Sequence, residues 1–305
     1  MIADYVLNSI LEIIFEVIKY LWNAFLATGM QIFIILGPAL ILASVMNLVA
    51  SAVEKSAYKV FGLKIYLYTF GWLGTAVHEI GHAIFCIIFR HKITEMKLFS
   101  IDTENKTLGH VNHSYNPNSF YQQVGKFFIG IGPIILGTIT IYYLSKYLLG
   151  PHIFVSSGTS MIDYNSFTSF NSLLLFFENI FNSGIEILSH IFSLNNFSDW
   201  KFYLFLYLAF SIGSSITLSR PDIEGALEGF GVMFTALLLL NIATLWVSGF
   251  VTKFFVDTSR LYTSIYPVMI FVILLNVFVS IILLIVSKSV STVKTNIQSA
   301  AKRRK

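Results

Sequence analysis

The stretch YLYTFGWLGTAVHEIGHAIFCIIF, residues 66–89, decides how this chain folds. It is apolar over a length that can cross a membrane, for which a helix needs about 20 residues. Inside it lie His78, Glu79 and His82, ionisable side chains that are costly to place in hydrocarbon. The stretch therefore predicts a transmembrane helix that carries a functional site.

The rest of the chain has the composition of a multi-pass membrane protein. Of its 305 residues, 55% are hydrophobic and 12% are charged, and the mean hydropathy is +0.73. A soluble domain carries roughly 25% charged residues. Four cations close the sequence at 302–305, so the net charge of +4 favours contact with the lipid bilayer and does not call for nucleic acid. Cys86 is the single cysteine, which excludes a disulfide within the chain and a cysteine-based metal cage.

Apolar runs of bilayer length predict an all-α polytopic membrane protein with six to seven transmembrane helices. The six clear spans are 30–50, 66–89, 127–149, 202–218, 223–251 and 262–286. Ahead of them, residues 5–30 carry a polar stripe at helical spacing, which predicts either an interfacial helix or a seventh span. That stripe consists of Asn8, Glu12, Glu16, Lys19 and Asn23. A similar stripe makes residues 171–193 an expected interfacial helix.

These segments predict a simple domain organisation. An amphipathic helix at 1–29 precedes a membrane-embedded domain at 30–287, whose core covers about 66–251, and a basic tail follows at 288–305. If the tail is cytoplasmic, six alternating spans put twelve Lys and Arg residues on the cytoplasmic side and seven on the other. We therefore expect a cell-membrane protein with a cytoplasmic C-terminus. The same alternation places His78, His82 and Asp222 toward the cytoplasmic side.

The pentad from His78 to His82 has the spacing of a zinc-binding motif. Residues i and i+4 of a helix face the same way with Cβ atoms about 5 to 6 Å apart, so both histidines can direct a nitrogen at one ion. A catalytic zinc site has three protein ligands and an open position for water. Glu79 is the expected general base for that water. The alternative is a pair of histidines that only hydrogen-bond to neighbouring helices, with Glu79 protonated.

A third ligand must come from elsewhere in the chain. The sequence Ser219-Arg220-Pro221-Asp222 predicts a helix start with Asp222 in its first turn. There the carboxylate either completes a metal site or complements the helix dipole. Gly225 and Gly229 are expected to let this helix press against the one that carries His78. The competing ligands are Glu224, Glu228, His110, His113 and His190.

Together these residues resemble the site-2 protease family of intramembrane zinc metalloproteases. The resemblance rests on the pentad, on Gly132-Pro133 in the next span and on an Asp in a later helix, and it covers about 66–251. It implies that His78, His82 and Asp222 hold zinc, that Glu79 is the general base, and that the substrate is a membrane protein cut in or near a transmembrane segment. The family's common Asp-Gly is here Asp222-Ile223-Glu224-Gly225, and the Asn often found after Gly-Pro is absent, which indicates a divergent branch.

Two short runs after the pentad predict a small β-hairpin at the cytoplasmic surface. They cover 93–102 and 108–115 and flank a polar turn at 103–107. The edge formed by Gly109, His110, Val111 and Asn112 is expected to bind an unwound substrate by strand addition. A plain connecting loop is the alternative.

Two functions of other classes also fit a polar cluster in a membrane. A zinc transporter could use the same histidines, but it is expected to carry a second polar helix with matched ligands. The other predicted spans are nearly free of charge. A non-catalytic scaffold derived from a protease usually loses the base, whereas Glu79 is present. The protease is therefore the function that the sequence favours.

Overall fold

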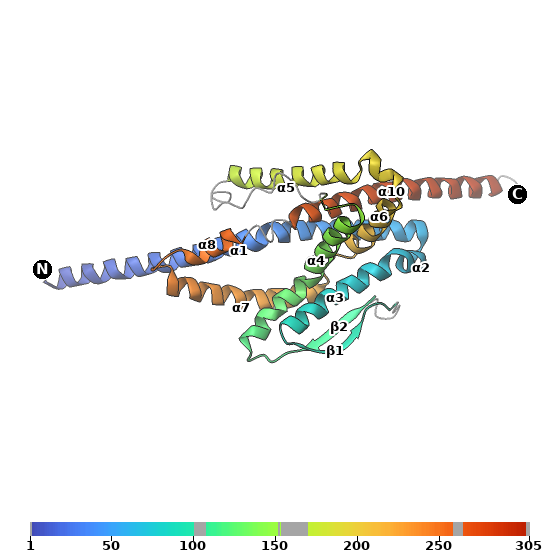
Figure 1. The fold of residues 1–305 in the computed structure, drawn as a ribbon. Coiled ribbons are helices and arrows are strands. Elements are labelled where there is room, and N and C mark those ends of the chain that lie inside the picture. Colours follow the sequence, from blue (N-terminus) through green and yellow to red (C-terminus); the bar gives the residue numbers. More distant parts are fainter. Residues whose placement is uncertain (1, 101–107, 152, 154–169, 259–264, 303–305) are drawn as a thin grey trace.

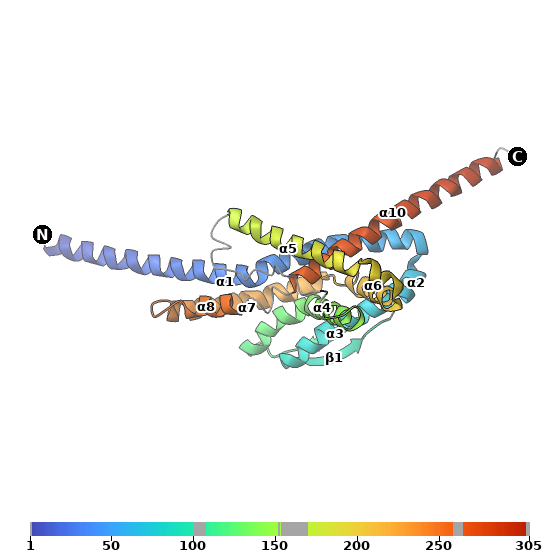
Figure 2. The same cartoon turned by 45° about the horizontal axis from the view of Figure 1, so that its top comes forward.

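The computed structural model describes residues 2–100, 108–151, 153, 170–258 and 265–302. This part of the chain is mostly helical and contains one sheet of two strands. The first helix, α1 (Ile2–Phe61), and the last, α10 (Tyr266–Lys302), pack against each other. They carry the two termini to opposite ends of the molecule (Figures 1 and 2). The turn predicted at 103–107 and the last residues of the predicted tail lie outside the described residues.

The other elements lie between these two helices in the sequence. In chain order they are α2 (Leu63–Tyr66), a π-helical turn η1 (Leu67–Gly71), α3 (Trp72–Ile88), β1 (Lys92–Lys97), β2 (His110–Ser114), α4 (Phe120–Leu148), α5 (Phe170–Ile191), a short helix η3 (Leu194–Ser198), α6 (Trp200–Gly213), α7 (Arg220–Thr244) and α8 (Phe250–Asp257). Five helices among the described residues are long and apolar enough to cross a membrane: Leu36–Phe61, Leu63–Ile88, Phe120–Leu148, Arg220–Thr244 and Tyr266–Ser289. They are consistent with an integral membrane protein.

Four predicted helical segments have different ends in the structure. The segments predicted at 5–30 and 30–50 form the single helix α1, because a polar stripe changes the faces of a helix without interrupting it. The span predicted at 202–218 is shorter, since α6 ends at Gly213. The span predicted at 223–251 is divided, with α7 ending at Thr244 and α8 beginning at Phe250. Apolar residues still occur at both ends, at Ile216 and Leu218 and at 245–247, so a hydropathy window extends past them.

The helix that carries the pentad touches α4 backbone to backbone. A Cβ atom on Gly81 would lie 2.8 Å from the backbone nitrogen and Cα of Pro133. In the other direction, a Cβ on Gly132 would lie 2.7 Å from the carbonyl oxygen of Gly81. Small residues permit such close helix contacts in membrane proteins. The pentad is thereby held directly against the Gly-Pro step of α4.

Helix α7 packs on α4 and not on α3, which corrects the expectation for its glycines. A Cβ on Gly229 would collide with the backbone of Phe127 in α4, whereas a Cβ on Gly225 would meet nothing within 4 Å. Helix α4 therefore lies between α3 and the later part of α7. The main hydrophobic core lies elsewhere, between α1, α5, α6 and α10, and includes the fully buried rings of Phe205 and Phe271.

The two predicted strands are confirmed, but the hairpin lies alongside α3 and not beyond its end. β1 and β2 pair antiparallel from Lys92↔Ser114 to Lys97↔His110, with an irregularity between Ile93 and Glu95. Lys92 follows α3 closely, and the ring centroid of Phe99 is 6.0 Å from that of Tyr68, which precedes α3. The hairpin therefore runs back along the helix, and β2 passes the pentad (Figure 1).

The contact between Gly81 and Pro133 can be tested with a matched pair of variants. Gly81→Ala forces a methyl group into the α4 backbone and should lower the free energy of unfolding by about 1–3 kcal/mol, the usual cost of overpacking. Gly231→Ala makes the same change on α7 where nothing lies within 4 Å, and should have little effect. Thermal unfolding in detergent micelles measures both. Equal stabilities for the two variants would contradict the packing.

Candidate metal centre

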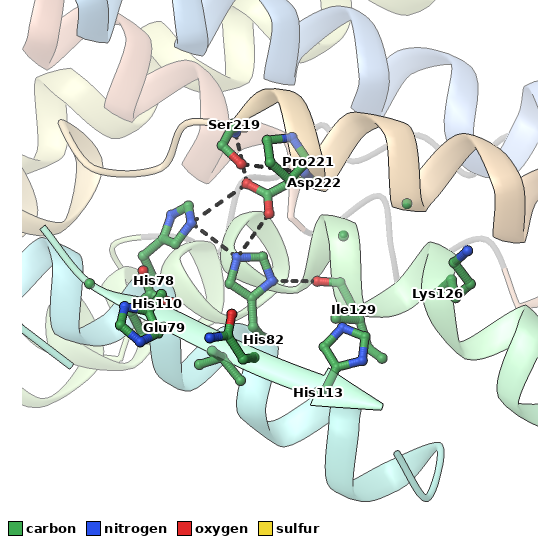
Figure 3. A pocket seen from close by; sticks show the side chains of 15 residues that line it. His78, Glu79, His82, His110, His113, Lys126, Ile129, Ser219, Pro221 and Asp222 are labelled. Carbon is green, nitrogen blue, oxygen red and sulfur yellow. Dashed lines mark hydrogen bonds and ion pairs between the residues drawn. The ribbon is translucent and has the colours of Figure 1, made fainter. Parts of the chain in front are cut away.

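Three side chains from two helices converge on one point. The Nε2 atoms of His78 and His82 are 3.1 Å apart. Asp222 places Oδ1 3.3 Å from Nε2 of His82 and Oδ2 3.8 Å from Nε2 of His78 (Figure 3). One ligand atom from each residue lies within 4.8 Å of the others. Two imidazole nitrogens and one carboxylate oxygen form a donor set that suits zinc and leaves room for a further ligand.

Hydrogen bonds to backbone carbonyls orient both imidazole rings. Nδ1 of His82 lies 2.8 Å from the carbonyl oxygen of Ile129, and Nδ1 of His78 lies 3.1 Å from that of Ser215. A carbonyl only accepts, so in each neutral ring Nδ1 carries the hydrogen and Nε2 keeps its lone pair. Metal-binding histidines typically have such a partner on the second nitrogen. Both lone pairs therefore point at the same place.

The two carbonyls are available because no helical N–H takes up their bonding capacity. In an α-helix the carbonyl of residue i accepts from the N–H of residue i+4. Four residues after Ile129 comes Pro133, which has no N–H. Ser215 lies in the irregular stretch after α6, where its carbonyl accepts from Thr217 and has a second lone pair for His78. The Gly-Pro step and the early end of α6 thus each leave a carbonyl that accepts from one of the histidines.

Asp222 is positioned by the start of α7, as the sequence predicts. The Ser219 side chain accepts from the N–H of Asp222 at 3.3 Å, and Oδ2 of Asp222 accepts from the N–H of Ser219 at 2.7 Å. This reciprocal capping box fixes the carboxylate at the first turn of the helix. Oδ1 takes part in no capping bond and faces His82. The capping role and the candidate ligand role therefore belong to the same side chain.

The other candidate ligands do not join this set. Within the described ranges, His78, His82 and Asp222 are the one group of three such residues with ligand atoms close enough to share an ion. Several of the excluded candidates have other partners: Glu228 pairs with Lys126, His110 with Glu95 and His190 with Glu186.

A cavity of about 430 Å³ lies beside the three residues. Its wall includes Glu79 and all of the predicted substrate edge, Gly109, His110, Val111 and Asn112 (Figure 3). Consecutive residues of a strand point to alternate faces. Because five in a row, 109–113, line this cavity, it borders the edge of β2 and not one face of the sheet.

Strand β2 is preceded by a glycine that lies directly against Glu79. A Cβ atom on Gly109 would lie 2.8 Å from Cγ of Glu79 and 3.0 Å from its Oε1. Glu79 is 6% exposed and is not one of the three converging side chains. Only glycine leaves room for the carboxylate under the chain here. Glu79 is thus held at the cavity wall, next to the candidate ligands.

Sequence reasoning missed three contributors to this site. The carbonyls of Ile129 and Ser215 are backbone groups, although Pro133 is a usable signal for the first. Lys126 also lines the cavity, where Nζ is 3.1 Å from the hydroxyl of Tyr115 and pairs with Glu228 on α7. Nothing in the local sequence of Lys126 marks it for this position.

The contact between Gly109 and Glu79 predicts a specific cross-link. In a Cys86→Ala background, Glu79→Cys puts a sulfur near the present Cγ, which is 2.8 Å from a Cβ on residue 109. We expect Glu79→Cys with Gly109→Cys to form a disulfide under mild oxidation, measured as two thiols lost to a maleimide reagent. Glu79→Cys with Gly225→Cys is the control and should keep both thiols. Free thiols in both pairs would argue against this position of the hairpin.

Comparison with known proteins adds no relative to this description. No protein-family model, no curated protein and no solved structure matches the chain. The case for a function therefore rests on the geometry of the site and on the chemistry of its residues.

Proposed function

We propose that this chain is an intramembrane zinc metalloprotease of the site-2 protease type, which hydrolyses a peptide bond in or near a transmembrane segment of another membrane protein. The observation that carries the proposal is the convergence of His78, His82 and Asp222 beside Glu79. These histidines lie ten and six residues before the end of α3 at Ile88. At a rise of 1.5 Å per residue this is about 15 Å and 9 Å inside a helix of membrane-spanning length.

The residues divide the chemistry between them. A zinc ion held by the two Nε2 atoms and the Asp222 carboxylate would act as a Lewis acid and lower the pKa of a water to about 7. Glu79 would serve as the general base, which takes up a proton from the attacking water and gives it to the leaving amine. The contact with Gly109 holds the Glu79 carboxylate at the cavity wall. Ile129 and Ser215 keep the imidazoles in the tautomer that presents Nε2.

The substrate lies along β2 in this proposal. β1 pairs with one edge of β2, and among the described residues no strand pairs with the other. The cavity borders β2 along 109–113. An extended peptide can add to such an edge through main-chain hydrogen bonds, which suits a protease because a helical peptide bond is poorly accessible. We therefore assign Gly109, His110, Val111 and Asn112 to substrate binding.

Contacts of α6 and α7 support a revised count of membrane crossings. α6 runs parallel to α3, since Tyr207 donates to the carbonyl of Thr69 and Ser215 accepts from His78. α7 continues in that direction, because Asp222 and Gly229 meet successively earlier parts of α4. We propose that α6 and α7 form one discontinuous crossing, whose irregular backbone is tolerated where it lines the cavity.

This count changes the expected topology. The crossings are then α1, α3, α4, the pair α6 and α7, and α10. Five crossings put the termini on opposite sides, and they separate the hairpin loop from the C-terminal tail, whereas six alternating spans put these two together. The cytoplasmic position of the basic tail stays a prediction of the positive-inside rule. Single cysteines introduced at Asn118 and Ser289 can be labelled with a membrane-impermeant reagent, which shows on which side of the membrane each position lies.

The role of Glu79 predicts a separation of zinc binding from cleavage. Glu79→Gln should keep zinc and lose about 10²- to 10⁴-fold in cleavage rate, the usual contribution of a general base. Membrane proteins trapped on this variant and identified by mass spectrometry supply the substrate, and elemental analysis gives the zinc content. Glu224→Gln, an exposed carboxylate outside the cavity wall, is the control and should cleave normally.

Two outcomes of this experiment contradict the proposal. Absence of zinc from the purified wild-type protein would contradict the proposed metal site. A transport assay in proteoliposomes provides the second test. Zinc uptake by the wild type, with no cleavage by wild type or Glu79→Gln, would identify a transporter.

The carbonyl of Ile129 accepts from His82 and from no helical N–H, which predicts an effect of Pro133, a residue that is not a ligand. Pro133→Ala restores an N–H that can bond to this carbonyl and compete with His82. Loss of such a supporting bond typically costs 10- to 100-fold in metal affinity. Competition with a chromophoric zinc chelator measures this, and Pro38→Ala in α1 is the matched control. Equal zinc affinities for both variants and wild type would show that the Pro133 step does not orient His82.

A further inference from the structure

A second pair of histidines lies at one end of the cavity wall. Nδ1 of His113, on β2, is 3.0 Å from Nδ1 of His91, which follows α3. Nε2 of His91 is 2.8 Å from the backbone carbonyl of Gln122 in α4. His91 is 5% exposed and stacks on the ring of Tyr115, with centroids 5.2 Å apart. Two imidazoles thus form a chain from a carbonyl to the cavity.

The carbonyl at one end fixes the hydrogen positions along this chain. It only accepts, so Nε2 of His91 carries the hydrogen. A neutral imidazole has one N–H, so Nδ1 of His91 accepts, and Nδ1 of His113 must donate to it. Nε2 of His113 is left with a lone pair. Both rings are neutral at pH 7, because burial lowers the pKa of His91 and, together with His91, His82 and Lys126, lowers that of His113 to about 4.

The lone pair of His113 has no donor among the described residues. Lys126, the nearby cation, interacts with Tyr115 and Glu228. Residue 113 lies four positions after residue 109, which precedes β2 and lies against Glu79. At about 3.3 Å per residue of extended chain, this is about 13 Å. A peptide extended along β2 therefore presents backbone N–H groups near both positions.

We propose that Nε2 of His113 accepts a hydrogen bond from a backbone N–H of the extended substrate and so positions it in the cavity. The inference rests on the proposed function, because it needs a peptide that runs from the metal centre along β2. It assigns to His113 a positioning role that is distinct from metal binding, since the described metal cluster does not include it.

Two substitutions separate this role from a purely structural one. His113→Asn places its amide near the present Nδ1, so it keeps the bond to His91 and removes the acceptor from the cavity. His113→Gln reaches the position of Nε2, so it keeps an acceptor in the cavity and gives up the bond to His91. Thermal unfolding of both variants reports on the structural link to His91.

The probes are hydroxamates, which bind zinc through their own chelating group and need no cleavage. Acetohydroxamate has no peptide part. Two further probes carry a tri-leucine peptide, one on the amino-terminal side of the chelating group and the other on its carboxy-terminal side. We expect His113→Asn to weaken one of the two peptides about three- to tenfold, the range of a net hydrogen bond. His113→Gln should stay within about twofold of wild type, and acetohydroxamate should bind all three proteins equally.

N-methylation of the peptide identifies the donor. Methylation of one backbone nitrogen should weaken binding to wild type and not to His113→Asn. The proposal is overturned if both variants bind both peptides as wild type does, or if His113→Gln is weakened and His113→Asn is not, because the second result assigns His113 to holding the hairpin. Failure of acetohydroxamate to bind wild type would instead overturn the metal site itself.

Discussion

Two hydrogen bonds, from the imidazoles of His78 and His82 to the carbonyls of Ser215 and Ile129, are the interactions on which the site depends. Without them each ring could turn its N–H toward the shared point, and the lone pairs would not converge. In a regular helix the backbone carbonyls accept from N–H groups of the same helix, so few carbonyls in a helical bundle are available to side chains. This chain provides two of them, one through a proline inside α4 and one in the irregular backbone after α6. A carbonyl without a partner is costly at membrane depth unless another group takes it up.

Close packing places these carbonyls within reach. Gly81 lies within the pentad and touches α4 at Pro133, the residue whose missing N–H frees the carbonyl of Ile129. The same residue pair thus sets the spacing of the two helices, and its proline leaves the Ile129 carbonyl available to His82. Asp222 combines two duties in a similar way, since one oxygen caps α7 and the other faces His82. The site is compact because a few residues each have more than one role.

Local patterns in the sequence predict much of this arrangement. The pentad spacing, the helix start before Asp222 and the two strands each depend on neighbouring residues, and the structure contains all three. The early end of α6, the packing of α7 on α4 and the course of the hairpin along α3 depend on contacts between distant segments. Hydropathy does not predict them because it reports local composition and not contacts between distant segments. The pairing of His91 with His113 depends on the strand register. Backbone acceptors cannot be read from the sequence, because every residue has a carbonyl.

The attachment of β2 at both of its ends has a consequence for how a bond would be chosen. One end lies on Glu79 through Gly109, and the other is tied through His113 and His91 to the frame of α3 and α4. The distance between the two attached ends of such a strand is fixed. A peptide aligned on it would be cut at a set number of residues from its anchoring point, whatever side chains occupy that bond, so selectivity would come from where a chain unwinds.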